Sequence, residues 1–467
     1  MTAGEEKVPP SPHMTANAGD AFSHPPVLQG EGQRMVTGGT CLFRLASGEI
    51  ALVRGGAPGD VATITPSDRR RGVLIGELHE LLQAGPQRRA IPCPLVTTGC
   101  GGCQWQHVHY TAQIQAKQRI VDDCLRRIGG VTDIPRSEAI AAPDEWHYRH
   151  TMQFVITPNG ELGLRRTQSH DTVPLTTCLI AHPLINRILE VLAQPLARVL
   201  LRDNASSITE MTVRIATKES TAAALIVFWT NGGERRQIRR LARLLMEGCS
   251  HVAGVVRISA SRRDFQAQHE TPVDLVAGTD VLEQELSGHV YLIGPTTFFQ
   301  VNLAQAAHLV QKVRQVVLER QATHILDLFC GVGLFSIGIA DLVDSIHGIE
   351  TSIAAIQLAR RAAEDANLSH KVKFSRADAL RRHPQQLTGY DLIIVDPPRS
   401  GLSTTLLESI ASSTVRTLVY ISCEPSTLAR DVKQLIAAQW SLSQIQIIDL
   451  FPQTYHVESL AVFSRLR

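Results

Sequence analysis

A cysteine and a glutamate near the end of the sequence are placed where nucleophilic chemistry would need them. Cys423, in VYISCEPSTLARD, ends a predicted strand just before a helix whose N-cap we expect to be Ser426. A helix N-terminus beside a thiol lowers its pKa and so increases the thiolate fraction. Glu458, in FPQTYHVESLAVF, lies between two strand-like segments with His456 close by. The alternatives are a packed core thiol and a surface charge on an edge strand.

This pair would suit methylation at carbon 5 of uracil. That carbon is a poor nucleophile, but addition of a thiolate at C6 gives an enolate whose C5 can attack a methyl sulfonium. A base must then remove the C5 proton before the thiolate is expelled. Because C6 cannot be reached inside a base stack, the target base would have to be flipped out. We therefore expect Cys423 to be the nucleophile, Glu458 the base and a uridine in RNA the substrate.

A glycine turn predicts the cofactor site. HILDLFCGVGLFSIGIA consists of a buried strand, a tight turn and an apolar helix, and Gly331 and Gly333 let the backbone pass close to a ligand there. Glu350 ends the next strand, 19 residues after Gly331, where an acid can accept hydrogen bonds from ribose hydroxyls. Asp378 ends the third strand, where contacts to an adenine edge would lie.

The choice of cofactor depends on a third position in this turn. A dinucleotide prefers G-x-G-x-x-G, and Ser336 stands where the last glycine would be. S-adenosyl-L-methionine is therefore favoured over NAD. Asp327, at the end of the first strand, could be only a helix cap. Asp396 opens D-P-P-R after the strand DLIIV, and the two prolines fix an extended loop that directs Asp396 into the cleft.

Four of the nine cysteines could bind a metal. Cys93, Cys100, Cys103 and the downstream Cys178 offer four thiolates, which suit either zinc or a [4Fe–4S] cluster. Spacing alone modestly favours zinc. Cys41, Cys124 and Cys249 have no partners in the sequence, so we expect them to be packing residues.

The elements that position these residues are clearest at the C-terminus. Strand-like runs alternate there with helical patterns such as SIAAIQLARRAAEDAN, which predicts a doubly wound, Rossmann-like α/β domain over residues 286–467. The last two segments, IQIIDLFP and VESLAVFSRL, fit an edge hairpin. The predicted strands are His324–Phe329, Ser345–Glu350, Lys371–Ser375, Tyr390–Val395 and Thr417–Ser422.

The first part of the chain divides into three predicted regions. Residues 1–28 are rich in Pro, Ala, Gly and Ser and read as a disordered tail. Short strand-like runs with glycine-rich turns predict a small OB-like β-barrel over residues 29–90. Residues 91–285 then form a central α+β domain with the cysteines, a helix near 111–128 and a strand pair around the turn 158–160.

Composition excludes few partners. The chain has 467 residues, a net charge of +2 and 44% hydrophobic residues, and neither a membrane span nor a secretory signal is apparent. We expect a cytoplasmic monomer whose cysteines stay reduced. Basic clusters are consistent with RNA phosphate contact; they lie at Arg69–Arg71, at Arg88 and Arg89, and at Arg236, Arg239, Arg240 and Arg243, the last four at helical spacing.

Several segments resemble the signatures of the RNA uracil-5-methyltransferase family. They are GPTTFFQVN, DLFCGVGLFS, DPPRSGL, YISCEPSTLARD and FPQTYHVESL, which cover residues 290–467 densely. The resemblance implies Cys423 as nucleophile and Glu458 as base. It also implies cofactor contacts from Gln300, Phe329, Glu350, Asp378 and Asp396. Leu334 departs from relatives that carry a polar residue there, which puts one cofactor hydrogen bond in doubt.

The N-terminal half resembles the branch of this family that acts on 23S rRNA. That likeness implies a TRAM domain for the barrel, a [4Fe–4S] cluster on the four cysteines and 23S rRNA as substrate in preference to tRNA. The six residues between Cys93 and Cys100 make a longer gap than the usual family pattern. The barrel is poor in aromatic residues, so we expect a mainly electrostatic role in RNA binding, with Phe43 as the best candidate for base stacking. Further RNA contacts are plausible at Gln104, Trp105, Gln106 and His107, with a core position as an equal alternative for Trp105.

Two other classes of function remain open. N-methylation of adenine or glutamine could use the D-P-P loop, although such enzymes favour an aromatic residue where Arg399 stands. The chain could also be a non-catalytic RNA-binding iron–sulfur protein that senses redox state.

Overall fold

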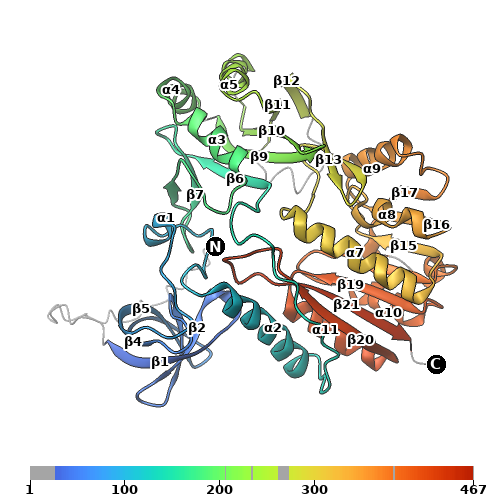
Figure 1. Ribbon diagram of the computed structural model, residues 1–467, viewed down its shortest axis with the longest axis horizontal. Helices are drawn as coiled ribbons and strands as arrows, with labels where there is room; N and C mark the ends of the chain where they lie inside the picture. The colour runs from blue at the N-terminus through green and yellow to red at the C-terminus, as the bar shows by residue number, and fades with distance from the viewer. Residues whose placement is uncertain (1–26, 206, 233–234, 261–272, 382–383, 466–467) are drawn as a thin grey trace, which may run out of the picture.

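The computed structural model describes residues 27–205, 207–232, 235–260, 273–381 and 384–465. Nearly all of the predicted N-terminal tail lies outside these residues. Figure 1 shows three parts: a small barrel that contains β1 to β5, a central sheet with α3 to α5, and a C-terminal sheet flanked by α7 to α11.

The barrel confirms the predicted closed arrangement of short strands. Its strand order is β1-β2-β3-β5-β4, and inward and outward residues alternate along β2. Phe43 therefore points inward and is fully buried, so the predicted stacking role for Phe43 is wrong. The strands are β1 (Leu28–Met35), β2 (Cys41–Leu45), β3 (Ile50–Arg54), β4 (Val61–Arg70) and β5 (Val73–Gln83).

The central part is a seven-stranded sheet in the order β12-β11-β10-β9-β6-β7-β8, mostly antiparallel. Helices α3 and α5 cover one face, where Leu189 and Leu241 pack against Phe228. The strands are β6 (Thr151–Ile156), β7 (Leu162–Arg165), β8 (Thr172–Pro174), β9 (Ile208–Lys218), β10 (Thr221–Thr230), β11 (Val252–Ile258) and β12 (Val273–Gly278). The helices are α1 (Pro94–Thr97), α2 (Tyr110–Arg127), α3 (Pro183–Leu192), α4 (Pro195–Asp203) and α5 (Arg235–Gly248).

The turn between β6 and β7 is the one predicted at residues 158–160. Gly160 has φ +74°, and a Cβ there would lie 2.3 Å from the carbonyl oxygen of Arg198. Glycine is needed here because it adopts a positive φ without strain and has no Cβ to collide with that oxygen. The turn thus sets the hairpin against α4.

The C-terminal sheet has the order β17-β16-β15-β18-β19-β21-β20, which confirms the predicted doubly wound domain. Five strands are parallel, and β21 inserts antiparallel between β19 and β20. Of the two strands predicted to form an edge hairpin, only β20 lies at an edge of the sheet, and β17 is the other edge strand. The strands are β15 (His324–Leu328), β16 (Ser345–Glu350), β17 (Val372–Arg376), β18 (Leu392–Val395), β19 (Thr417–Ser422), β20 (Trp440–Ile448) and β21 (Glu458–Arg465).

Helices pack on both faces of this sheet, and a two-stranded ribbon of β13 (Leu282–Leu286) and β14 (His289–Ile293) precedes it. The helices are α7 (Leu303–Arg320), α8 (Leu334–Gly338), α9 (Ile353–Asp365), α10 (Thr404–Ser412) and α11 (Pro425–Ala437). The 3₁₀ turns are η1 (Thr37–Gly39), η2 (Ala340–Leu342), η3 (Ala379–Arg381) and η4 (Pro384–Leu387). In the part of the chain that the structure describes, no helix is long and apolar enough to cross a membrane.

Candidate active site

The glycine turn after β15 has the predicted form. Phe329 leaves the strand with φ +65°, one residue earlier than predicted, and Gly331 and Gly333 have φ +54° and +88°. A Cβ on Gly333 would meet the Phe374 ring at 2.8 Å. The turn lines a narrow cavity, whose walls are Phe298, Phe299, Gln300, Phe329, Cys330, Gly331, Val332, Leu334, Phe335 and Asp396. Gln300, Phe329, Gly331 and Asp396 of the predicted cofactor set therefore share one cavity.

Glu350 ends β16 and Asp378 lies two residues beyond the end of β17, but neither residue lines this cavity. Glu350 accepts hydrogen bonds from Gly331 N at 3.2 Å and Thr351 N at 2.6 Å. Its carboxylate thereby braces the glycine turn. Asp378 accepts from Leu380 N at 3.0 Å and pairs with Arg381 at 3.2 Å. Their contacts to ribose and adenine stay predictions.

Asp327 behaves as a helix cap. Its Oδ2 accepts hydrogen bonds from Ser336 N at 3.1 Å and from Ser336 Oγ at 2.5 Å. Ser336 is the third residue of α8, where a free backbone N–H needs an acceptor. Burial raises the pKa of Asp327 to about 7.

The predicted cap of α11 is wrong. The helix begins at Pro425, so the N-cap is Glu424. Proline suits the first helical position because its missing N–H has no partner there in any case. The carboxylate of Glu424 accepts hydrogen bonds from Ser426 N at 3.3 Å and Ser426 Oγ at 2.8 Å. Cys423 thus lies just outside the helix.

Cys423, Glu458 and Asp396 come together at the edge of the sheet. Glu458 is 4% exposed, at the start of the interior strand β21, so a surface charge on an edge strand is excluded. Burial and the neighbouring Asp396 raise the pKa of Glu458, and burial and Asp327 raise the pKa of Asp396. Two carboxyl groups in such a place favour their protonated forms.

The thiol of Cys423 is less acidic than the neighbouring N-terminus of α11 predicts. Burial raises its pKa to about 11, and the Glu458 and Asp396 carboxyl groups add to this, while Arg399 opposes it. The expected lowering by the helix end is therefore wrong for the protein without ligands, since burial and two acids outweigh it.

This pKa predicts how alkylation of Cys423 depends on pH. The thiolate is the reactive form, so the rate with iodoacetamide should rise about tenfold per pH unit between about pH 7 and 9. Quantification of the peptide that contains Cys423 by mass spectrometry would measure it. A rate that levels off near neutral pH would contradict the raised pKa.

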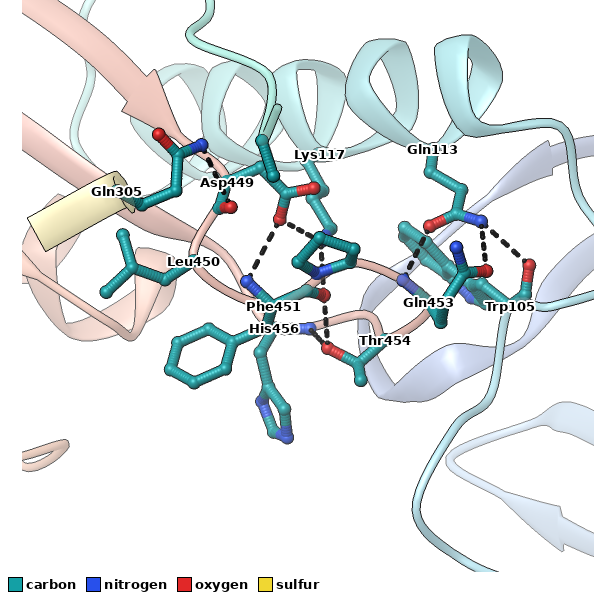
Figure 2. A network of polar contacts seen from close by, with 12 residues as sticks. Trp105, Gln113, Lys117, Gln305, Asp449, Leu450, Phe451, Gln453, Thr454 and His456 are labelled. Atoms are coloured by element: carbon teal, nitrogen blue, oxygen red, sulfur yellow. Dashed lines mark hydrogen bonds and ion pairs between the residues drawn. The ribbon is translucent and has the colours of Figure 1, made fainter. Parts of the chain in front are cut away.

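A network of buried polar contacts holds the loop between β20 and β21 (Figure 2). Lys117 Nζ donates to Asp449 Oδ1 at 2.6 Å and to the Phe451 carbonyl at 2.9 Å. The Gln113 side chain accepts from Gln453 N at 2.9 Å. Lys117 and Gln113 both lie on α2, outside the C-terminal domain. Helix α2 therefore fixes the loop that leads into Glu458.

Three cationic side chains act on His456. The Arg399 guanidinium lies 3.4 Å from His456 Nδ1. Burial, with Arg399, Lys117 and Arg149 nearby, lowers the pKa of His456 to about 4. The imidazole is therefore neutral at physiological pH. Nothing in the sequence near Lys117 or Arg149 predicts a role for them. Arg399 could be noticed only because it follows the two prolines of the D-P-P loop.

The four predicted metal-ligating cysteines line one cavity of about 170 Å³ with apolar walls. Burial raises the pKa of Cys103 to about 12 and also raises those of Cys100 and Cys178. Among the described residues, no three His, Cys, Asp or Glu side chains are placed to hold a single metal ion. Of the expected packing cysteines, Cys41 and Cys249 are buried and Cys124 half-buried.

The RNA contacts predicted after the cysteines are mostly wrong. Trp105, Gln106 and His107 are 0%, 2% and 4% exposed, because this segment packs between the barrel and α2. Arg88 and Arg89 pair with Asp60 and Glu145. By contrast, the outer face of α5 is basic as predicted, with four exposed arginines at positions 236, 239, 240 and 243.

A doubly wound sheet whose glycine turn, acidic strand ends and D-P-P loop meet at one edge is a Rossmann-like methyltransferase domain, here with a buried thiol beside it. The chain belongs to the tRNA (uracil-5-)-methyltransferase family, whose model matches residues 109–466. This confirms the family and the class of enzyme that the sequence predicted.

Relatives match along nearly the whole chain. An uncharacterized RNA methyltransferase of Gloeobacter violaceus is 32% identical over 92% of this chain and 95% of its own length. A second, from Thermosynechococcus vestitus, is 30% identical over 89% and 93%. The crystal structure of Pyrococcus abyssi tRNA (uracil-54, C5)-methyltransferase in complex with S-adenosyl-L-homocysteine has the same fold. Its TM-score is 0.72 at 24% identity, and the match covers 93% of this chain and 100% of that one.

Proposed function

We propose that this protein transfers a methyl group from S-adenosyl-L-methionine to C5 of a uridine in RNA. The observation that carries the proposal is the buried meeting of Cys423, Glu458 and Asp396 beside the glycine turn. A non-catalytic redox sensor has no need of this arrangement. N-methylation has no need of the thiol.

The cofactor cavity suits an amino-acid and sulfonium group. Gln300 and Asp396 offer polar contacts there, and Phe329 and Gly331 shape its wall. Glu350 and Asp378 would hold the ribose and the adenine from the adjoining strand ends. A positive sulfonium near Asp396 would favour the carboxylate form of that residue. The bound cofactor supplies the electrophilic methyl group.

The protein's own groups account for the other steps. Cys423 loses its proton to solvent, and its thiolate sulfur forms a bond to uracil C6 while the electron pair of the C5–C6 double bond moves into an enolate. After methyl transfer, Glu458 in its carboxylate form accepts the C5 proton, the double bond re-forms and the sulfur–C6 bond breaks, which releases the thiolate. A carboxylate whose conjugate acid has a raised pKa is a stronger base for this step.

Glu458→Gln should separate methyl transfer from release. Glutamine cannot accept the C5 proton, so the methylated adduct should accumulate and its breakdown should slow by about 10²–10⁴-fold. A single-turnover assay with labelled cofactor would detect an RNA–protein complex that resists detergent. Glu364→Gln, an exposed change on α9, is the matched control. Normal multiple turnover in Glu458→Gln would remove Glu458 from the role of base.

The RNA substrate is proposed to be 23S rRNA, with tRNA as the second candidate. The barrel, as a TRAM domain at residues 29–90, and the four cysteines favour rRNA. The family name and the Pyrococcus abyssi enzyme favour tRNA. Mapping 5-methyluridine by mass spectrometry in both RNAs, with and without the gene, decides between them. Unchanged 5-methyluridine in both would contradict the proposed function.

The cysteines at positions 93, 100, 103 and 178 are proposed to hold a [4Fe–4S] cluster, with zinc as the alternative. All four cysteines line one cavity, and four thiolates suit either group. The resemblance of the N-terminal half to the 23S rRNA enzymes favours the cluster. Iron, zinc and acid-labile sulfide should be measured in protein purified without oxygen. Zinc without sulfide would overturn the cluster.

A further inference from the structure

One face of the central sheet carries a polar patch on β6 and β9, although the same face is apolar on β10, where Leu225 and Val227 join the core of the C-terminal domain. On β6 and β9, Phe154, Met211 and Val213 point toward α3 and α5. The opposite face carries two cross-strand pairs, Thr151 with Arg214 and Gln153 with Thr212. Strand side chains alternate between faces, so these four residues all point toward the C-terminal domain. The sequence thus keeps this patch hydrophilic.

The polar face and residues 295–301 enclose a cavity of about 390 Å³. Arg214 is 6% exposed and donates from Nη1 to the Pro295 carbonyl at 3.0 Å. Arg149 at the rim donates from Nε to the Thr151 carbonyl at 3.1 Å, and among the described residues no carboxylate pairs with it. No acidic side chain is among the described residues that line the cavity; these also include Trp229, Thr296, Thr297, Phe298, Phe299 and Val301.

This chemistry suits a nucleotide. Guanidinium and hydroxyl groups bind phosphate oxygens. The carboxylate of Glu210, which accepts a hydrogen bond from Gln153, lines the adjoining cavity instead. Trp229 and Phe298 add aromatic rings, and Phe298 is 65% exposed, as a platform for base stacking would be. A cavity of this volume is in the range that accommodates an organic ligand, so its size points to more than a bare anion.

The cavity adjoins the catalytic cleft. Phe298 and Phe299 line both this cavity and the cofactor cavity that contains Asp396. The Arg149 guanidinium is close enough to His456 to help lower its pKa. A strand whose target base lies against Cys423 would therefore pass this cavity within a short distance.

We propose that the cavity binds the phosphate and base of an unpaired RNA nucleotide next to the target uridine. Arg149 and Arg214 hold the phosphate, and Phe298 stacks on the base. This inference rests on the proposed function and assigns the central sheet a share in substrate binding. It also gives Arg149 a positioning role toward the strand that enters the cleft.

Binding of a short single-stranded RNA that contains the target uridine tests this directly. Fluorescence anisotropy over a range of salt concentrations should show about tenfold weaker binding by Arg149→Gln, with a salt slope shallower by about 0.7. Arg149→Lys should keep the slope and lose part of the affinity. Arg361→Gln removes an exposed charge on α9 and should change nothing. Equal binding by Arg149→Gln and Arg361→Gln would overturn the proposal.

A second variant guards against indirect effects, because Arg149 also borders the cysteine cavity. Thr296→Val changes only one hydroxyl in the lining and should weaken binding by about twofold to threefold. Binding like wild type, with Arg149→Gln alone affected, would mean that the effect comes from the cysteine cavity, and the nucleotide site would be rejected.

Neutral linkages in the RNA locate the phosphate. One methylphosphonate beside the target should weaken wild-type binding and leave Arg149→Gln unaffected, whereas no such position would overturn the inference. Competition by uridine monophosphate distinguishes a site for free nucleotides, which would displace the RNA, from a strand site, which would not. Since these are binding measurements, they can fail while wild-type protein still forms 5-methyluridine.

Discussion

Cys423→Ser should abolish methyl transfer, with a loss of at least about 10³-fold, because a serine hydroxyl cannot replace the thiolate in addition to C6. The measurement is incorporation of labelled methyl groups into RNA that lacks 5-methyluridine. Cofactor binding should persist, since Cys423 does not line the cavity beside the glycine turn. Calorimetry with S-adenosyl-L-homocysteine would check this.

The matched control for this variant is Cys124→Ser. Cys124 is half-buried and packs against the core under α2, so the same chemical change there should leave methyl transfer within about twofold of wild type. If Cys423→Ser turned over at the wild-type rate, the thiol would be a packing residue and N-methylation through the D-P-P loop would gain support.

Lys117→Met should destabilise the protein by about 3–5 kcal/mol. Lys117 and Asp449 form an ion pair with both side chains fully buried. Removal of the cation leaves the Asp449 carboxylate buried without its charge partner. Tyr110 and Phe451 N still donate to it, but neither carries a charge. The free energy of unfolding from urea titration measures the loss.

A double variant shows whether the pair is the cause. Lys117→Met with Asp449→Asn removes both charges and keeps an acceptor for Tyr110, so it should recover a large part of the lost stability. Losses that simply add would show that the two side chains do not interact. Because this pair anchors the loop before Glu458, the single variant should also lower the rate of methyl transfer in the part of the protein that remains folded.

The architecture of the C-terminal domain could be predicted because its signals are local. Each buried strand is a run of apolar residues and each helix repeats them at helical spacing, so β15, β16 and β19 begin where predicted. The tight turn after β15 could also be predicted, because the positive φ angles at Gly331 and Gly333 favour glycine. Cys423 follows the parallel strand β19, whereas Glu458 lies at the same edge because it begins the antiparallel strand β21.

Other features depend on contacts that no local pattern records. Lys117 and Asp449 are 332 positions apart, and nothing near either residue signals a partner. A base-stacking role was predicted for Phe43 because the sequence of a short strand does not show which side chains face the interior of the barrel. Trp105 was equally ambiguous until α2 and the barrel were seen to enclose it.

The acidity of Cys423 shows a conflict between local and tertiary effects. The helix end that follows it is a local feature and predicts a low pKa. Burial and the carboxyl groups of Glu458 and Asp396 come from other strands and raise the pKa instead. Because the pKa is raised, the enzyme without ligands keeps the Cys423 thiol largely protonated. Binding of a cationic cofactor would lower this pKa again.

RNA with 5-fluorouridine at the target position tests the central claim most directly. Fluorine at C5 cannot leave as a proton does, so Glu458 has nothing to remove and the sulfur–C6 bond should persist. With S-adenosyl-L-methionine present, the wild-type protein should form a stable RNA complex, and peptide mass spectrometry should place the link on Cys423. A link on another residue, or none while ordinary uridine is methylated, would contradict the account.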